Sequence, residues 1–167
     1  MIKKTFILII FSLLLTNASF AAGSGGAGDD NSIKKLQDPK TRAYKVIDKA
    51  KKLEKKGKIK KAKKNYKKAF EILSKYNKKN PSEPNVLNYL GFTSRKIGNF
   101  EDAEAYYMMG LSIDPNHNGI NEYLGELYLQ TNRKDQALER LQALASCNCE
   151  EYKQLKDIID GKTQSKY

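Results

Sequence analysis

The sequence predicts an all-α fold: an α-solenoid of three helix-turn-helix repeats followed by a C-terminal capping helix. The first observation is a repeat, because Tyr89-Leu90-Gly91 returns 34 residues later as Tyr123-Leu124-Gly125. A fixed period of this length is typical of repeat architectures. The second observation is that apolar residues recur at helical spacing through most of residues 41–160. Together these observations predict stacked pairs of helices.

Residues 1–21 have the pattern of a secretory signal peptide. Lys3 and Lys4 precede an apolar run from residue 5 to residue 16, and the small residue Ala21 precedes the expected cut. The run is shorter than the ~20 residues of a membrane span. We therefore expect an exported, periplasmic protein without a stable membrane span after cleavage, and a retained N-terminal anchor is the alternative. Residues 22–40 are Gly-rich in their first half and poor in apolar groups, which predicts a flexible leader.

The predicted helical domain spans residues 41–161, and its first part is a degenerate repeat. Gly57 separates two segments that each carry one apolar face. Gly57, Ala62 and Tyr66 recur 41 residues further on, and Ile59 is matched there by Phe100, at an offset seven residues longer than the period. We therefore place a first repeat at about 43–83, with a second helix that is longer by about two turns and ends near Asn80.

The second and third repeats are predicted at 84–117 and 118–151. Gly98 fits the left-handed residue that ends a helix, and Asn132 takes the same place in the third repeat. Asn99 is placed as a helix N-cap. A capping helix at 150–160 covers the open end of the stack, and residues 162–167 form a tail. The repeat signature comprises Leu90, Gly91, Gly98, Ala103, Tyr107 and Pro115 in the second repeat, and Leu124, Gly125, Tyr128 and Ala137 in the third.

This pattern resembles the tetratricopeptide repeat (TPR), and the chain is similar to small exported TPR proteins of bacteria. The resemblance implies a non-enzymatic protein-protein interaction module, an adaptor or scaffold that holds a segment of its partner in a groove lined by the first helix of each repeat. Asn88 and Phe92 offer that segment an amide and an aromatic ring; the alternative is that both only contact a neighbouring helix. The groove positions carried onto this sequence are Asn85, Asn88, Phe92, Arg95, Lys96, Gly119, Glu122, Glu126, Leu129 and Gln130.

Positive charge is concentrated in the first repeat. Residues 33–83 contain 20 Lys or Arg and 5 Asp or Glu, whereas residues 84–167 contain 9 and 12. This asymmetry indicates an anionic partner. Because export makes nucleic acid an unexpected partner, a second candidate function is a basic structural protein that binds an anionic envelope polymer or lipid surface. The alternative is that the lysines only solvate the helices.

The sequence shows no convergent catalytic set, and we expect neither an enzyme nor a cofactor or metal site. The single His, His117, lies in a turn without an evident partner. Cys147 and Cys149 are an even number of cysteines in an exported chain, which favours a disulfide. The resemblance implies a local staple at the capping helix. A thiol-redox centre and a soft-metal thiolate pair are two further candidate roles for the same cysteines.

Overall fold

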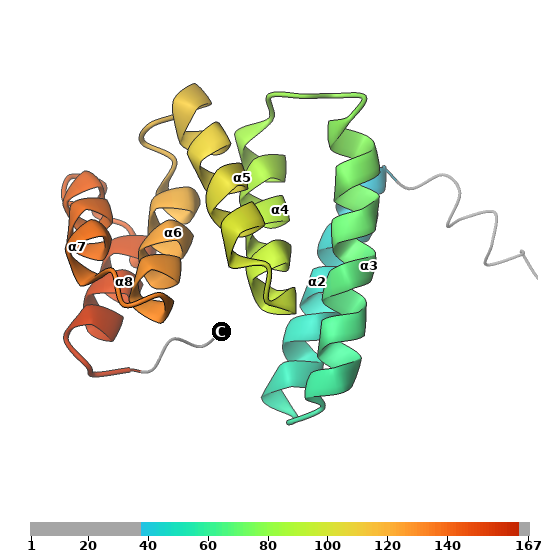
Figure 1. Ribbon diagram of the computed structural model, residues 1–167, viewed down its shortest axis with the longest axis horizontal. Coiled ribbons are helices and arrows are strands. Elements are labelled where there is room, and N and C mark those ends of the chain that lie inside the picture. Colours follow the sequence, from blue (N-terminus) through green and yellow to red (C-terminus); the bar gives the residue numbers. More distant parts are fainter. Residues whose placement is uncertain (1–37, 164–167) are drawn as a thin grey trace, which may run out of the picture. The chain divides into compact units, whose positions relative to one another are not determined.

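The computed structural model describes residues 38–163, and these residues form seven α-helices (Figure 1). The predicted signal peptide and most of the predicted leader lie outside these residues. The all-α prediction is confirmed. The helices are α2 (Pro39–Lys55), α3 (Ile59–Asn77), α4 (Pro84–Ile97), α5 (Phe100–Ile113), α6 (Asn118–Gln130), α7 (Lys134–Ala143) and α8 (Glu150–Ile159).

The helices pack in three consecutive pairs, α2 with α3, α4 with α5 and α6 with α7, and α8 follows them. Figure 1 shows the pairs in chain order across the view, from α2 and α3 on the right to α7 and α8 on the left. Neighbouring pairs touch through α3 and α4 and through α5 and α6. The helix α8 packs mainly on α6 and less on α7. This is the predicted arrangement of helix-turn-helix repeats with a C-terminal helix.

Local sequence signals set most helix ends. Pro39 occupies the first position of α2, and the Asp38 side chain accepts a hydrogen bond from the Thr41 backbone N–H at 3.0 Å. Proline and an aspartate cap favour a helix start at this point. The helix therefore begins two residues before the predicted Thr41. Gly98 and Asn132 have left-handed φ angles of 99° and 58°, as predicted for the two repeat turns.

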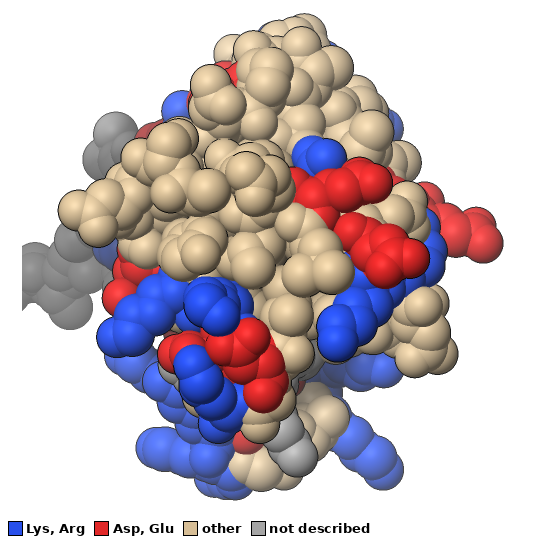
Figure 2. All heavy atoms as spheres, turned by 90° about the vertical axis from the view of Figure 1, so that its left-hand side faces the viewer, with Lys and Arg blue, Asp and Glu red and all other residues tan. Residues whose placement is uncertain are grey.

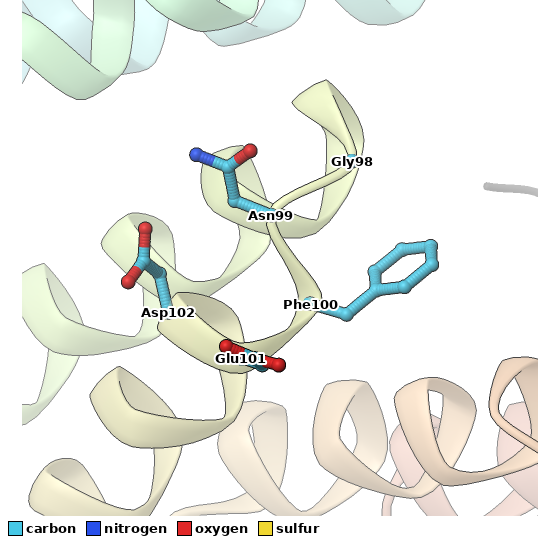
Figure 3. A pocket seen from close by; sticks show the side chains of 5 residues that line it. All are labelled: Gly98, Asn99, Phe100, Glu101 and Asp102. Carbon is cyan, nitrogen blue, oxygen red and sulfur yellow. The ribbon is translucent and has the colours of Figure 1, made fainter.

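The turn between α4 and α5 differs from the prediction in one detail. Asn99 stands at the N-cap position of α5, but its side chain makes no capping hydrogen bond. Figure 3 shows the residues around this turn, with the side chains of Asn99 and Asp102 on one side and the Phe100 ring on the other. The acidic residues Glu101 and Asp102 in the first turn of α5 still favour this end of the helix, because its unpaired N–H groups carry partial positive charge.

Small residues let the helices of each pair approach closely. Ala103 and Ala137, the predicted small signature residues of the second helices, are fully buried. A Cβ atom added at Gly91 would lie 2.6 Å from Cδ1 of the buried Tyr107 ring. At the equivalent Gly125, an added Cβ would lie 2.6 Å from a methyl carbon of Leu155 on α8. Gly91 therefore leaves room for Tyr107 of α5, and Gly125 leaves room for Leu155 of α8.

Candidate functional site

The first helices of the three pairs place side chains against one another on a common face, which we call the inner face. Lys96 of α4 pairs with Glu54 of α2, and Arg95 of α4 pairs with Glu126 of α6. Helices α4 and α6 also touch directly. The inner face consists of Lys51 and Glu54 of α2, Asn88, Phe92, Arg95 and Lys96 of α4, and Glu122, Tyr123, Glu126 and Gln130 of α6.

Aromatic rings occupy the middle of the inner face. The Phe92 ring meets Tyr66 edge-on at a centroid distance of 5.7 Å and Tyr123 in a tilted arrangement at 5.1 Å. The ammonium group of Lys51 lies 4.8 Å from the Phe92 centroid. Rings with a cation over one face supply apolar contact area and a fixed positive charge at the same place. Phe92 is thus a point of contact between the first, second and third helical pairs.

A buried ion pair lies beside the rings. Arg95 Nη1 donates to Glu126 Oε2 at 3.0 Å and to Gln130 Oε1 at 3.2 Å. The side chains of Arg95 and Glu126 are 1% and 2% exposed. Arg95 Nε and Nη2 are buried without a hydrogen-bond partner, and so is Asn88 Oδ1. Unpaired buried polar groups are costly, and these three atoms are enclosed by the fold, so they lower its stability and do not face a partner.

Several charged groups of the inner face have shifted pKa values. Burial lowers the pKa of the Lys51 ammonium, and burial also lowers the pKa of Lys96 against the opposing effect of Glu54. Burial, reinforced by the carboxylates of Glu126 and Glu151, raises the pKa of Glu122 to about 8. At neutral pH Glu122 is therefore mainly protonated and able to donate a hydrogen bond.

The predicted groove residues are distributed unevenly. Asn88, Phe92, Arg95, Glu122 and Glu126 are buried, Lys96 and Leu129 are half-buried, and Asn85 and Gln130 are exposed. Arg95, Glu126 and Gln130 adjoin one another through the hydrogen bonds described above. Two of the predicted residues lie elsewhere. Asn85 lies at the start of α4, where its Oδ1 is 3.0 Å from His117 Nε2. Leu129 packs against the core around Ala103 and Tyr107. The role of these residues in binding a partner stays a prediction.

His117 has a structural role that the sequence did not reveal. It stands at the N-cap of α6, where its Nδ1 accepts a hydrogen bond from the Ile120 backbone N–H at 3.2 Å. An accepting Nδ1 requires the tautomer with a proton on Nε2, which then donates to Asn85. The imidazole therefore ties the starts of α4 and α6 together. Its position just before a helical segment was the only signal available in the sequence.

Cys147 and Cys149 are joined by a disulfide in the turn before α8, with their Cα atoms 5.1 Å apart. Cys149 is the N-cap residue of α8, and Asn148 between the cysteines has a left-handed φ of 47°. The bridge therefore fixes the turn from which α8 starts. In the part of the chain from 38 to 163, no three His, Cys, Asp or Glu side chains are grouped as metal ligands. No helix within that part is long and apolar enough to cross a membrane.

Comparison with known proteins agrees with this architecture. Residues 85–117 match the family model of the tetratricopeptide repeat. The fold is similar to that of the type III secretion translocator chaperone SycD of Yersinia enterocolitica, with a TM-score of 0.53 and 15% sequence identity over 81% of this chain and 93% of that chain. At this identity the similarity is one of fold. No curated protein sequence matches the chain.

Two further structures are more distant. The Sgt2 TPR domain of Aspergillus fumigatus aligns with a TM-score of 0.46 and 17% identity, over 72% of this chain and 78% of that chain. The Arabidopsis OM64 TPR domain aligns with a TM-score of 0.47 and 14% sequence identity, over 75% of this chain and 100% of that chain. The family match and the helical pairs converge on the second pair, α4 with α5, where the predicted signature is most complete. Residues 85–117 are therefore similar to a tetratricopeptide repeat, and the helical pairs on either side of them have the same helix-turn-helix arrangement.

Proposed function

We propose that this protein is a non-enzymatic adaptor that binds a segment of a protein partner on its inner face. TPR domains generally bind protein or peptide partners. The observation that carries the proposal is the inner face itself, where the first helices of the three pairs bring charged and aromatic side chains together. A peptide presents carbonyl and N–H groups in every residue, and the Lys51 ammonium and the exposed Gln130 amide are groups of this face that can hydrogen-bond to them.

The rest of the inner face defines the chemistry of the segment. Tyr123, which is half-buried and packs on the fully buried Phe92 ring, offers an apolar surface for a side chain of the partner, as large rings do at many interfaces. Lys51 and Lys96 supply positive charge next to Glu54, Glu122 and Glu126. The segment that fits best carries an apolar side chain flanked by polar and charged groups.

We also propose that the protein acts outside the cytoplasm, in the periplasm. The support is the sequence pattern of the N-terminus, with Lys3 and Lys4 followed by an apolar run and Ala21. Fractionation of cells followed by N-terminal sequencing tests this proposal. A protein that begins near residue 22 in the exported fraction supports it, and a full-length chain in the cytoplasm contradicts it.

Capture from an extract of the producing cells tests the adaptor function. The bait is the full chain, compared with a variant that combines Lys51→Ala and Asn88→Ala. The matched control combines Lys134→Ala and Asn116→Ala, two exposed residues outside the inner face. We expect one stoichiometric protein on the wild-type and control baits and its loss from the inner-face variant. Equal capture by all three baits would place the binding surface elsewhere.

A further inference from the structure

The outer side of the first repeat carries a group of exposed lysines. Lys64, Lys67 and Lys68 of α3 are exposed, on the side opposite the buried Ala62 and Tyr66. None of the three forms a salt bridge with a carboxylate of residues 38–163. A shallow hollow between these lysines is also lined by two further residues of α3, Asn65 and Glu71.

The second repeat has methionines where the first has these lysines. The two repeats are offset by 41 residues, so Met108 and Met109 of α5 are equivalent to Lys67 and Lys68. Met108 and Met109 are 52% and 51% exposed, and Ile113 at the end of the same helix is 45% exposed. Methionine is flexible and polarizable and is common on adaptable apolar binding surfaces. An uncovered group of this kind on one helix indicates an interaction surface.

Helices α3 and α5, which carry the lysines and the methionines, meet at an aromatic contact. Phe70 of α3 and Tyr106 of α5 meet edge-on at a centroid distance of 6.1 Å. Tyr66 and Tyr107, which are equivalent in the two repeats, are both buried. The side chains on the opposite sides of α3 and α5 therefore point outward together. We call this surface the outer face, defined by Lys64, Lys67, Lys68, Met108, Met109 and Ile113.

Charge is distributed unevenly over the rest of the molecule as well. Figure 2 views the molecule from the α7 and α8 end and shows mainly uncharged atoms in its upper part, with Lys, Arg, Asp and Glu side chains intermixed below. The carboxylates of these two helices are Glu71 of α3 and Glu101, Asp102 and Glu104 of α5, and Glu104 is paired with Arg133. Glu101 and Asp102 lie two turns before the methionines, at the level of Lys60 and Lys61 in the repeat register. Residues 60–68 of α3, which are in register with residues 101–109, contain six lysines and no carboxylate.

We propose that the outer face binds the surface of an anionic lipid bilayer, with the lysines over the headgroups and the methionines inserted at the acyl boundary. Each Lys near an anionic leaflet contributes attraction, and exposed apolar side chains bury area in the interface. A soluble polyanion would use the lysines alone, because it offers no apolar interior. The exposed methionines beside the lysines thus favour lipid over an anionic polymer. This binding is independent of the inner face and leaves that face available.

Vesicle co-sedimentation tests the proposal with the full chain. The vesicles are an equimolar mixture of phosphatidylcholine and phosphatidylglycerol, and vesicles of phosphatidylcholine alone are the neutral reference. We expect Lys67→Gln with Lys68→Gln to lower the partition coefficient on the anionic vesicles by about 10- to 30-fold. Met108→Ser with Met109→Ser should lower it by about 10-fold. Because every variant keeps residues 1–37, any contribution of the N-terminal apolar run is common to all of them.

Two controls separate lipid binding from general electrostatic attraction and from the binding of a soluble polyanion. Lys134→Gln with Lys153→Gln removes the same charge from exposed positions outside the outer face and should reduce partitioning by less than about threefold. Retention on immobilised polyphosphate should fall for the Lys67 and Lys68 variant and stay unchanged for the methionine variant. Two results overturn the proposal: vesicle binding that the methionine variant leaves intact, or equal loss in the two lysine variants. Thermal melting of each variant checks that the fold is retained.

Discussion

Gly91→Ala tests the register of the repeats at the point where α4 and α5 cross. A methyl group at this position would lie 2.6 Å from Cδ1 and 2.8 Å from Cζ of Tyr107. Carbon atoms in favourable contact are separated by about 3.5–4.0 Å, so the ring has to move by about 1 Å. Tyr107 is fully buried, and the close packing around it opposes such a shift.

The magnitude follows from two opposing effects. Alanine is favoured over glycine in a helix interior by about 1 kcal/mol. Overpacking a tight core costs typically about 1–3 kcal/mol and occasionally more, and a ring held on all sides belongs at the upper end of this range. We therefore expect a net loss of about 1–2 kcal/mol in the free energy of unfolding, which lowers the Tm by roughly 3–10 °C in a domain of this size.

A double-mutant cycle identifies the cause. Tyr107→Leu removes the ring, so Gly91→Ala in that background should be neutral or stabilising, with a coupling energy of about 1–3 kcal/mol. The measurements are urea unfolding at 25 °C and thermal melting, followed by circular dichroism. Gly98→Ala is a useful comparison, because its φ of 99° leads to strain although no atom lies closer than 4.0 Å to the added Cβ. A Gly91→Ala protein that unfolds like wild type, or additive effects in the cycle, would refute the contact.

Four further predictions concern other parts of the fold. Ala103→Leu should destabilise by about 1–3 kcal/mol in urea unfolding, because the site is fully buried. His117→Ala should cost about 1 kcal/mol in the same assay, because α6 loses its N-cap. The pKa of Glu122 in the folded protein is about 8, above its ordinary value of 4.5. Ionised Glu122 therefore lowers the free energy of unfolding by an amount that grows as the pH rises from 4.5 to about 8. Glu122→Gln should therefore raise the stability by about 2–4 kcal/mol near pH 9 and leave it unchanged near pH 4, as measured by unfolding at both pH values. Cys147→Ser with Cys149→Ser should speed hydrogen exchange in α8 and leave inner-face binding intact, because contacts in repeat arrays are between neighbours.

The 34-residue period was sufficient to predict the helical pairs, because it depends on small and large residues that must meet at each helix crossing. Gly98 and Asn132 were predictable for a related reason, since few residue types tolerate a left-handed turn. The greater length of the second helix in the first repeat was also predictable from the register, since α3 spans 19 residues and α5 spans 14, but α3 ends at Asn77 and not near Asn80. Periodicity thus determines the elements and most of their ends.

The finer contacts were not predictable from the period. The hydrogen bonds of His117 depend on the distance between the starts of α4 and α6, which no pattern in one helix encodes. The failure of Asn99 to cap α5 depends on the choice of one side-chain rotamer. The arrangement around Arg95 requires knowing which residues of α6 come opposite α4. Such contacts depend on the distance and angle between two helices, and a one-dimensional sequence pattern does not specify either.

The insertion of Leu155 over Gly125 has a consequence for how such a chain can grow by duplication. In the second repeat, the surface beyond α4 and α5 receives α6, whereas α8 occupies part of the corresponding surface beyond α6 and α7. A tandem copy of residues 84–117 placed between residues 117 and 118 would pack against a helical pair on both sides. A copy added after residue 151 would compete with α8 for its contact surface. Recombination should therefore lengthen this array from within.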